Sequence, residues 1–263
     1  MRVPSSTSPG QDRLEVRRLI LSLSVIGVSL FGLFMFSLVD RAEAQRKQGD
    51  SLILADFSDS PVDGLPKAWT WKKEDNDKNK PYKIVEESDG NRYLAADDHG
   101  ESVILGNEIQ WDLSEYPYLE FRWRARSLPE GGDERYGDKN DSAAGLYVTY
   151  RKKAGMVPIS AKFVWSSTLP VGSATRRSGV GRPFNVVVDS GDEHLNQWRT
   201  HVVDLTEIFE KTFDGKPPKK AIGIGVLTDA NSVCGIAAAD YDYIRALEDA
   251  KPTFSVSDIL EAE

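Results

Sequence analysis

Three carboxylates, Glu120, Asp141 and Asp229, are the side chains of this sequence that could supply acid–base chemistry. Glycoside hydrolysis needs two carboxyl groups at a set separation, one to protonate the leaving group and one to act as base or nucleophile. A sequence gives no separation in space, so the same residues are also explained as surface or turn carboxylates. A carbohydrate-active hydrolase or lyase is therefore one hypothesis for the function.

Other catalytic patterns do not accompany these carboxylates. The sequence has no G-x-S-x-G elbow, no phosphate-binding loop and no H-E-x-x-H helix, and its three histidines are scattered. The single cysteine, Cys234, excludes an intrachain disulfide and a cysteine-based zinc site. These absences favour a protein that binds without catalysing a reaction.

The stretch Tyr118 to Arg126 alternates apolar and charged residues, which is typical of a strand with one buried face. Phe121 and Trp123 are then expected in the core, and Arg122 and Arg124 on the opposite face. Guanidinium groups there could bind a ligand through paired directional donors, or they could form cross-strand ion pairs, the commoner fate of an exposed charge row.

Trp165 could stack on a sugar ring. It shares its strand parity with Ile159, Ala161 and Phe163, which equally predicts a place in the core. The segment Ser127 to Ser142 is a second place for function, because it is the longest irregular stretch and is rich in glycine and charge. It contains the carboxylates Asp133, Asp138 and Asp141.

The chain begins with a pattern that is typical of export. The arginines Arg13, Arg17 and Arg18 precede an uncharged apolar run from Leu19 to Val39, so we expect the remainder to lie outside the cytoplasm. Ala42-Glu43-Ala44 has the shape of a cleavage site, but the run is also long enough to span a bilayer. A periplasmic protein and one anchored in the inner membrane both remain open.

Length and charge limit the remaining organisation. The chain has 263 residues and a net charge of −8, and its field repels polyanions, so a nucleic-acid partner is not expected. We expect a signal peptide or signal anchor over residues 1–44, a single domain over 45–250 and a C-terminal tail over 251–263. The oligomeric state does not follow from the sequence.

Short apolar or alternating runs separated by turn residues predict strands and little helix. The expected strands are Leu52 to Phe57, Tyr82 to Glu86, Arg92 to Ala96, Ser102 to Leu105, Tyr118 to Arg126, Ala144 to Arg151, Ile159 to Trp165, Phe184 to Asp189, Trp198 to Asp204, Ala221 to Thr228 and Asp240 to Leu247. A short helix is expected over Thr206 to Phe213. Without alternation of strands and helices, the pattern predicts an all-β, antiparallel, jelly-roll-like sandwich.

The order of short motifs over Leu52 to Ala246 resembles the bacterial family named domain of unknown function 3047. The matching pieces are Leu65-Pro66 before Trp69, Pro117-x-Leu119-x-Phe121-Arg122-Trp123, Asp141-x-Ala143-Ala144, Phe163-Val164-Trp165, Thr228-Asp229-Ala230-Asn231-Ser232 and Ala239-Asp240-Tyr241-Asp242-x-Ile244. Gly145 stands where an arginine is common in that family, and Asn140 and Ala230 stand where aspartates are. The resemblance implies a group of proteins and no activity.

The pattern is also similar to that of jelly-roll carbohydrate-binding modules, in its Asp56-Phe57 strand end, its Trp198 before Asp204-Leu205 and its last strand with Asp242. This second resemblance implies a structural calcium ion held by Asp56 with Asp240 or Asp242. The alternative is that these are strand-end aspartates bonded to turn amides.

The leading hypothesis is an exported, non-catalytic β-sandwich that binds a glycan or another cell-envelope component. A structural subunit of an envelope complex is a third hypothesis, beside the hydrolase or lyase. The candidate ligand-binding residues are Arg122, Arg124, Asp141, Trp165, Asp229 and Asn231.

Overall fold

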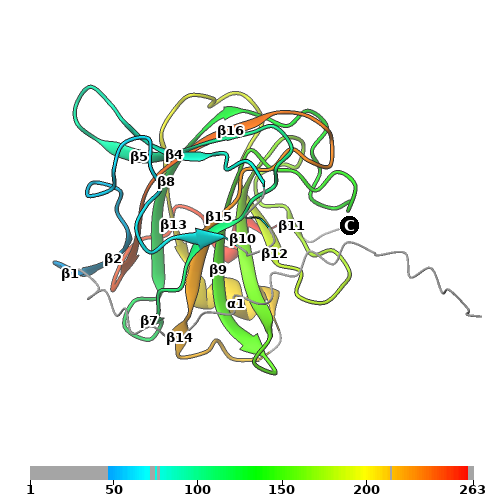
Figure 1. Cartoon of the computed structure of the whole chain (residues 1–263). Helices are drawn as coiled ribbons and strands as arrows, with labels where there is room; N and C mark the ends of the chain where they lie inside the picture. Colours follow the sequence, from blue (N-terminus) through cyan, green and yellow to red (C-terminus); the bar gives the residue numbers. More distant parts are fainter. Residues whose placement is uncertain (1–46, 72–74, 76–77, 214, 260–263) are drawn as a thin grey trace, which may run out of the picture.

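The computed structural model describes residues 47–71, 75, 78–213 and 215–259. The expected signal peptide or anchor, with its apolar run 19–39, lies outside the described residues. Within the described part, no helix is long and apolar enough to cross a membrane. The described part is built almost entirely of strands, and one α-helix covers an end of the assembly (Figure 1).

The described strands form two seven-stranded sheets and one two-stranded sheet. Sheet A contains β1 (Lys47–Gln48), β2 (Ser51–Ala55), β4 (Tyr82–Glu86), β5 (Arg92–Asp98), β8 (Tyr118–Ser127), β13 (Arg199–Asp204) and β16 (Ala237–Leu247). Sheet B runs in the order β11 (Ala174–Thr175), β12 (Phe184–Ser190), β10 (Val157–Ser166), β9 (Ala144–Lys153), β15 (Gly223–Val226), β6 (Leu105–Asn107) and β3 (Thr70–Trp71). The small sheet pairs β7 (Trp111–Asp112) with β14 (Lys220–Ala221).

The last strand, β16, organises sheet A. Its whole length pairs with β8 on one side, while β5 and β2 share its other side, one along each half. Strand β13 extends the sheet beyond β8. The expected antiparallel arrangement holds for these pairs. In sheet B it fails at one place, because β10 and β12 are parallel. The connection 167–183 carries the chain back to the same end before β12 begins.

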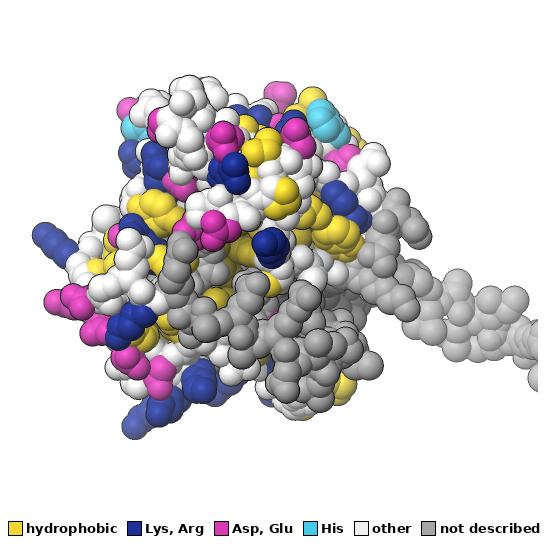
Figure 2. All heavy atoms as spheres, turned by 60° about the vertical axis from the view of Figure 1, so that its left-hand side comes forward, with side chains coloured by type: hydrophobic (Ala, Val, Ile, Leu, Met, Phe, Trp, Pro, Cys, Tyr) yellow, Lys and Arg dark blue, Asp and Glu magenta, His cyan; other side chains and the backbone are white. Residues whose placement is uncertain are grey.

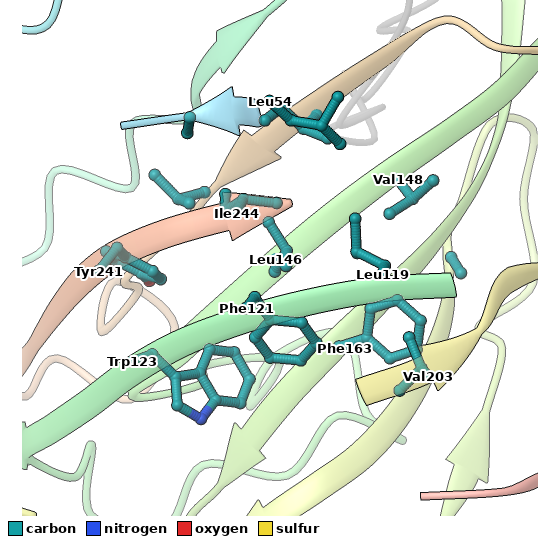
Figure 3. Packing of buried hydrophobic residues seen from close by; sticks show 14 of the residues in the cluster. Leu54, Leu119, Phe121, Trp123, Leu146, Val148, Phe163, Val203, Tyr241 and Ile244 are labelled. Atoms are coloured by element: carbon teal, nitrogen blue, oxygen red, sulfur yellow. The ribbon is translucent and has the colours of Figure 1, made fainter. Parts of the chain in front are cut away.

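The core lies between the two sheets, and the alternation of β8 determines what enters it. Leu119, Phe121, Trp123 and Ala125 are all buried, as the sequence predicts. The ring of Phe121 lies 5.8 Å from that of Phe163 on β10, so the two sheets are in direct aromatic contact (Figure 3). Mostly β and built of two packed sheets, the domain is a β-sandwich.

Helix α1 (Leu205–Thr212) agrees within a residue with the expected helix. Asp204 caps its N-terminus by accepting hydrogen bonds from the amides of Thr206 and Glu207. Phe209 of α1 packs edge-on against Tyr150 of β9, with ring centroids 4.9 Å apart. The expected tail also contacts the core, because Phe254 before the 3₁₀ helix η2 (Val256–Asp258) is buried beside Val203.

A buried carboxylate joins the two sheets by hydrogen bonds. Asp189, at the end of β12 in sheet B, accepts the indole N–H of Trp123 at 2.8 Å and lies 2.6 Å from Nε2 of His201, both in sheet A. Asp189 is only 3% exposed, so water cannot replace these bonds.

We predict that Asp189→Ala lowers the free energy of unfolding by about 3 kcal/mol, because Trp123 and His201 would lose a buried acceptor. Asp189→Asn keeps an acceptor oxygen and should lose less. Asp192→Ala, which removes an exposed carboxylate from the next turn, is the matched control. Urea unfolding measures all three, and equal losses for the two alanine variants would contradict the prediction.

Candidate functional site

The arginine face of sheet A is closed by ion pairs. Arg122 Nη1 lies 2.6 Å from Asp242 Oδ2, Arg124 Nε lies 2.7 Å from Asp240 Oδ2, and Arg126 Nε lies 2.9 Å from Asp240 Oδ1. The register sets Asp240 of β16 opposite Arg124 of β8, and Asp242 lies at the irregularity of the same pairing between Tyr241 and Ile244. Two of the candidate ligand-binding residues, Arg122 and Arg124, are therefore engaged within the protein.

Aromatic stacking completes this arrangement. The ring of Trp198 lies 4.6 Å from the guanidinium of Arg122 and 4.3 Å from that of Arg124. Glu120, one of the three candidate catalytic carboxylates, pairs with Arg245 on the same sheet. Figure 2 likewise shows basic and acidic side chains interspersed rather than gathered by sign on the face that it presents. The geometry therefore supports the interpretation that these arginines form ion pairs within the protein, rather than the interpretation that they bind a ligand.

The carboxylates assigned to calcium are bonded in other ways. Asp240 and Asp242 pair with the arginines, and Asp56 Oδ1 accepts the amide of Ser58 at 2.9 Å, as in a turn. Burial raises the pKa of Asp240 and of Asp242, against the opposing effect of the arginines. Over the residues that the structure describes, no group of three or more His, Cys, Asp or Glu side chains could hold a metal ion.

Trp165 lies in the core, as its strand parity predicts. It is fully buried, and its indole N–H donates to the carbonyl of Gly191 at 3.0 Å. Its ring lies 6.4 Å from that of Trp123 across the sandwich. Stacking against an external sugar is therefore not open to this side chain.

Polar and small residues form a row across the outer face of sheet B. Adjacent strands place in register Thr70, Gly106, Gly225, Tyr147, Lys162, Asn185 and Thr175. Their chain neighbours Leu105, Val226 and Phe163 point into the core, so this cross-sheet row points away from it. Tyr147 also packs against Ile104 and Leu227 in a small apolar cluster on that face.

Asp141 and Asp229 meet beside this row. Their segments are joined by a bridge in which the amide of Asp229 donates to the carbonyl of Ser142 at 3.1 Å. Asp141 Oδ2 accepts the amides of Ser232 and Val233, whereas its Oδ1 is buried without a hydrogen-bond partner among the described residues. Asn231 lies on the same loop with an exposed side chain.

Lys162 brings a buried positive charge to these carboxylates. Its ammonium donates to Ser142 Oγ at 3.3 Å, and Ser142 Oγ donates to Glu134 Oε1 at 2.8 Å. Ser166 Oγ donates to the other oxygen of Glu134 at 2.7 Å. All of these groups are buried, so the long loop 127–142 is fixed to sheet B through charged hydrogen bonds.

Gly145 makes room for this lysine. A Cβ at position 145 would lie 2.4 Å from Lys162 Cε and 3.1 Å from the carbonyl oxygen of Leu227. Lys162, Glu134 and Tyr147 were not among the site residues predicted from the sequence. A lysine at an outward strand position usually reaches solvent, so Lys162 gave no sign of its buried place. A glycine inside a strand of β-branched and aromatic residues was the available signal.

We name Glu134, Asp141, Lys162 and Asp229 the buried charge cluster. Burial raises the pKa of Asp229 to about 7, Lys162 opposes the rise and Asp141 adds to it. Burial also lowers the pKa of Lys162, against the attraction of Asp229 and Glu134. A carboxyl group that gains and loses its proton near neutral pH is thus held beside an ammonium and a second carboxylate.

The fold and this cluster define a β-sandwich domain with a polar site on the outer face of one sheet. Residues 67–245 match the model of the family described as protein of unknown function (DUF3047), and the chain belongs to that family. Comparison with curated proteins finds no match.

Solved structures with a similar fold include carbohydrate-binding modules. The family 11 module of the cellulosomal cellulase Lic26A-Cel5E of Clostridium thermocellum has 12% identity and a TM-score of 0.38, covering 78% of this chain and 98% of the module. The CBM27-1 module of Caldicellulosiruptor saccharolyticus, in complex with mannohexaose, has 13% identity and a TM-score of 0.37, covering 78% of this chain and all (100%) of the module.

We predict that Asp229→Asn flattens the dependence of stability on pH. The pKa of Asp229 is about 7 in the folded chain against an ordinary value of 3.8, so between these pH values the folded state holds a proton that the unfolded chain has released. The stability from this group is fully present below about pH 4 and is lost as pH rises towards 7, by about 4 kcal/mol.

Melting temperatures of wild type and Asp229→Asn, measured from pH 4 to 8 at constant ionic strength, test this prediction. The wild type should lose stability relative to the variant as pH rises, and the difference should level off above pH 7. Parallel curves would show that Asp229 has an ordinary pKa.

Proposed function

We propose that the protein is an exported, non-catalytic β-sandwich that binds a glycan or another cell-envelope component on the outer face of sheet B. One observation carries the proposal, the polar row with buried atoms that lack hydrogen-bond partners. Thr70 Oγ1 and Asn185 Oδ1 of the row, and Asp141 Oδ1 beside it, have none within the described part of the chain. Buried polar groups are bonded in nearly all native structures, so such atoms point to a polar ligand or bound water.

The chemistry of the row suits a ligand rich in hydroxyl groups. A hydroxyl both donates and accepts, and the row holds an ammonium, a side-chain amide and hydroxyl groups on one sheet. Lys162 is 1% and Asn185 3% exposed, so a ligand reaches these two groups only when the residues that cover them move aside. Gly106 and Gly225 carry no side chain there, and the strands pack closely at this point, because a Cβ on Gly225 would lie 3.3 Å from the carbonyl oxygen of Leu105. Sugars present hydroxyls of this kind in a fixed ring.

The other candidate surface also holds buried polar atoms without partners in the described part of the chain, Trp198 Nε1 and Arg245 Nε, but its arginines are already engaged. On the outer face of sheet A, Arg122 and Arg124 are bonded to carboxylates and stacked on Trp198. A ligand would have to displace those contacts before it could bind. The loop 127–142, in contrast, holds Glu134 against Ser166 of β10, and its Asp141 accepts the amides of Ser232 and Val233.

We predict that Asn185→Ala and Lys162→Met each weaken glycan binding about tenfold or more, because each removes a directional polar group from the row. Lys83→Met, an exposed lysine on β4 of sheet A, is the matched control and should bind like wild type. Binding is measured on an array of envelope and plant polysaccharides, followed by calorimetry with the strongest ligand. Circular dichroism confirms folding of each variant.

Two results would contradict this proposal. If no polysaccharide binds above background, the proposal that the protein binds a glycan is wrong. Loss of binding in Arg122→Ala with Arg124→Ala, with Asn185→Ala unaffected, would move the site to sheet A.

A second function, hydrolysis or elimination of a glycan, is favoured by the convergence of Asp141 and Asp229. A carboxyl group with a pKa of about 7 is half protonated at neutral pH, which suits a general acid, and an adjacent carboxylate could act as base. Glu120 takes no part in this version, since it lies on sheet A.

Catalysis and binding make different predictions for Asp229→Asn. If the protein is a hydrolase or lyase, the variant should lose at least a hundredfold in rate of reducing-end release while still binding the polymer. Asp97→Asn, an outward carboxylate on sheet A, serves as control. A wild-type protein that binds a polysaccharide without shortening it over a day would exclude the enzyme for that polymer.

A further inference from the structure

The segment that joins β10 to β12 carries positive charge without compensation from its own residues. Residues 167–183 contain Arg176, Arg177 and Arg182 and no aspartate or glutamate. The whole chain has a net charge of −8, so this local excess departs from its average. The segment is also fixed in place, because Ser167 Oγ and Thr168 Oγ1 donate to the carbonyls of Pro129 and Gly132, each at 2.7 Å.

Arg177 differs from the arginines of sheet A in having no ion pair. Within the described part of the chain, no carboxylate oxygen lies within 4.0 Å of its guanidinium, although the side chain is half-buried. Burial and then the neighbouring Arg182 lower the pKa of Arg177, and Tyr147, Asp229 and Asp141 oppose this. An unpaired, partly desolvated guanidinium is costly unless an anion binds it.

The surroundings of Arg177 connect it with the proposed site. Its charge and that of Arg182 both act on the phenol of Tyr147, the aromatic residue of the cross-sheet row. Its Nη1 lies 3.6 Å from the position that a Cβ on Gly137 would take, so the guanidinium rests against the loop 127–142. The residue before that glycine, Tyr136, is 51% exposed and offers an aromatic ring to solvent.

We propose that Arg177 binds the carboxylate of an acidic sugar, so that the ligand is a polysaccharide containing uronic acid. The planar guanidinium presents two parallel donors that match a carboxylate. Tyr136, on the adjacent loop, supplies an apolar ring on which the sugar can stack. Since the net negative charge of the chain opposes general attraction of polyanions, the affinity has to come from these local contacts. This inference rests on the function proposed above and adds the class of glycan.

The test compares polygalacturonate with its fully methyl-esterified form, which carries an uncharged methyl ester in place of each carboxylate, by calorimetry with the full chain. We expect the esterified polymer to bind at least tenfold more weakly than polygalacturonate. Arg177→Gln should weaken binding of polygalacturonate by a similar factor. Arg177→Lys should weaken it by less, because lysine keeps the positive charge but lacks the two parallel donors of the guanidinium. Arg176→Gln is the matched control, since Arg176 is the exposed neighbour that stacks on Phe213.

The outcomes distinguish the inference that the ligand is an acidic polysaccharide from the proposal that the protein binds a glycan. Equal binding of both polymers, binding of neutral glycans alone, or wild-type affinity in Arg177→Gln would overturn the acidic-sugar inference and leave glycan binding intact. Equal losses in Arg176→Gln and Arg177→Gln would show diffuse attraction and would also overturn it. Binding of no polysaccharide at all would overturn both.

Discussion

The contact between the two sheets is the constraint on which the rest of the molecule depends. Phe121 and Trp123 of β8 meet Phe163 and Trp165 of β10, and Asp189 adds hydrogen bonds across the same interface. Because strand side chains alternate, placing these rings inside decides which residues point outward on both sheets. The outward position of Arg122 and Arg124 on sheet A and that of the cross-sheet row on sheet B both follow from the way the two sheets pack.

The two outer faces use their charges in opposite ways. On sheet A, Arg122 and Arg124 are bonded to Asp242 and Asp240, so these charges stabilise the sheet and leave few donors for a ligand. On sheet B the loop 127–142 covers the strands and removes Lys162 and Asp229 from water. Charge without full compensation in a desolvated place is expensive, and proteins keep such places mostly where function requires them.

The sequence predicted the strands and the core well, because both depend on local alternation. The expected ends of β4 match those observed, and β8, β9, β10 and β12 differ by three residues or fewer. The two-residue strands and the parallel pairing of β10 with β12 depend on contacts between distant segments and left no local signal. For the same reason Asp141 and Asp229 could be named as candidates, but their meeting, and the role of Lys162, could not.

Gly145 has a consequence for how this site can change during evolution. The space above it is filled by the end of the Lys162 side chain from the neighbouring strand, so a long side chain at 145 would displace the Lys162 ammonium from its present position. The arginine that the family resemblance places at this position would extend from β9 towards the space that Lys162 now fills from β10. An arginine at 145 would therefore require the end of the Lys162 side chain to move or to be shortened, so the effects of substitutions at the two positions are coupled.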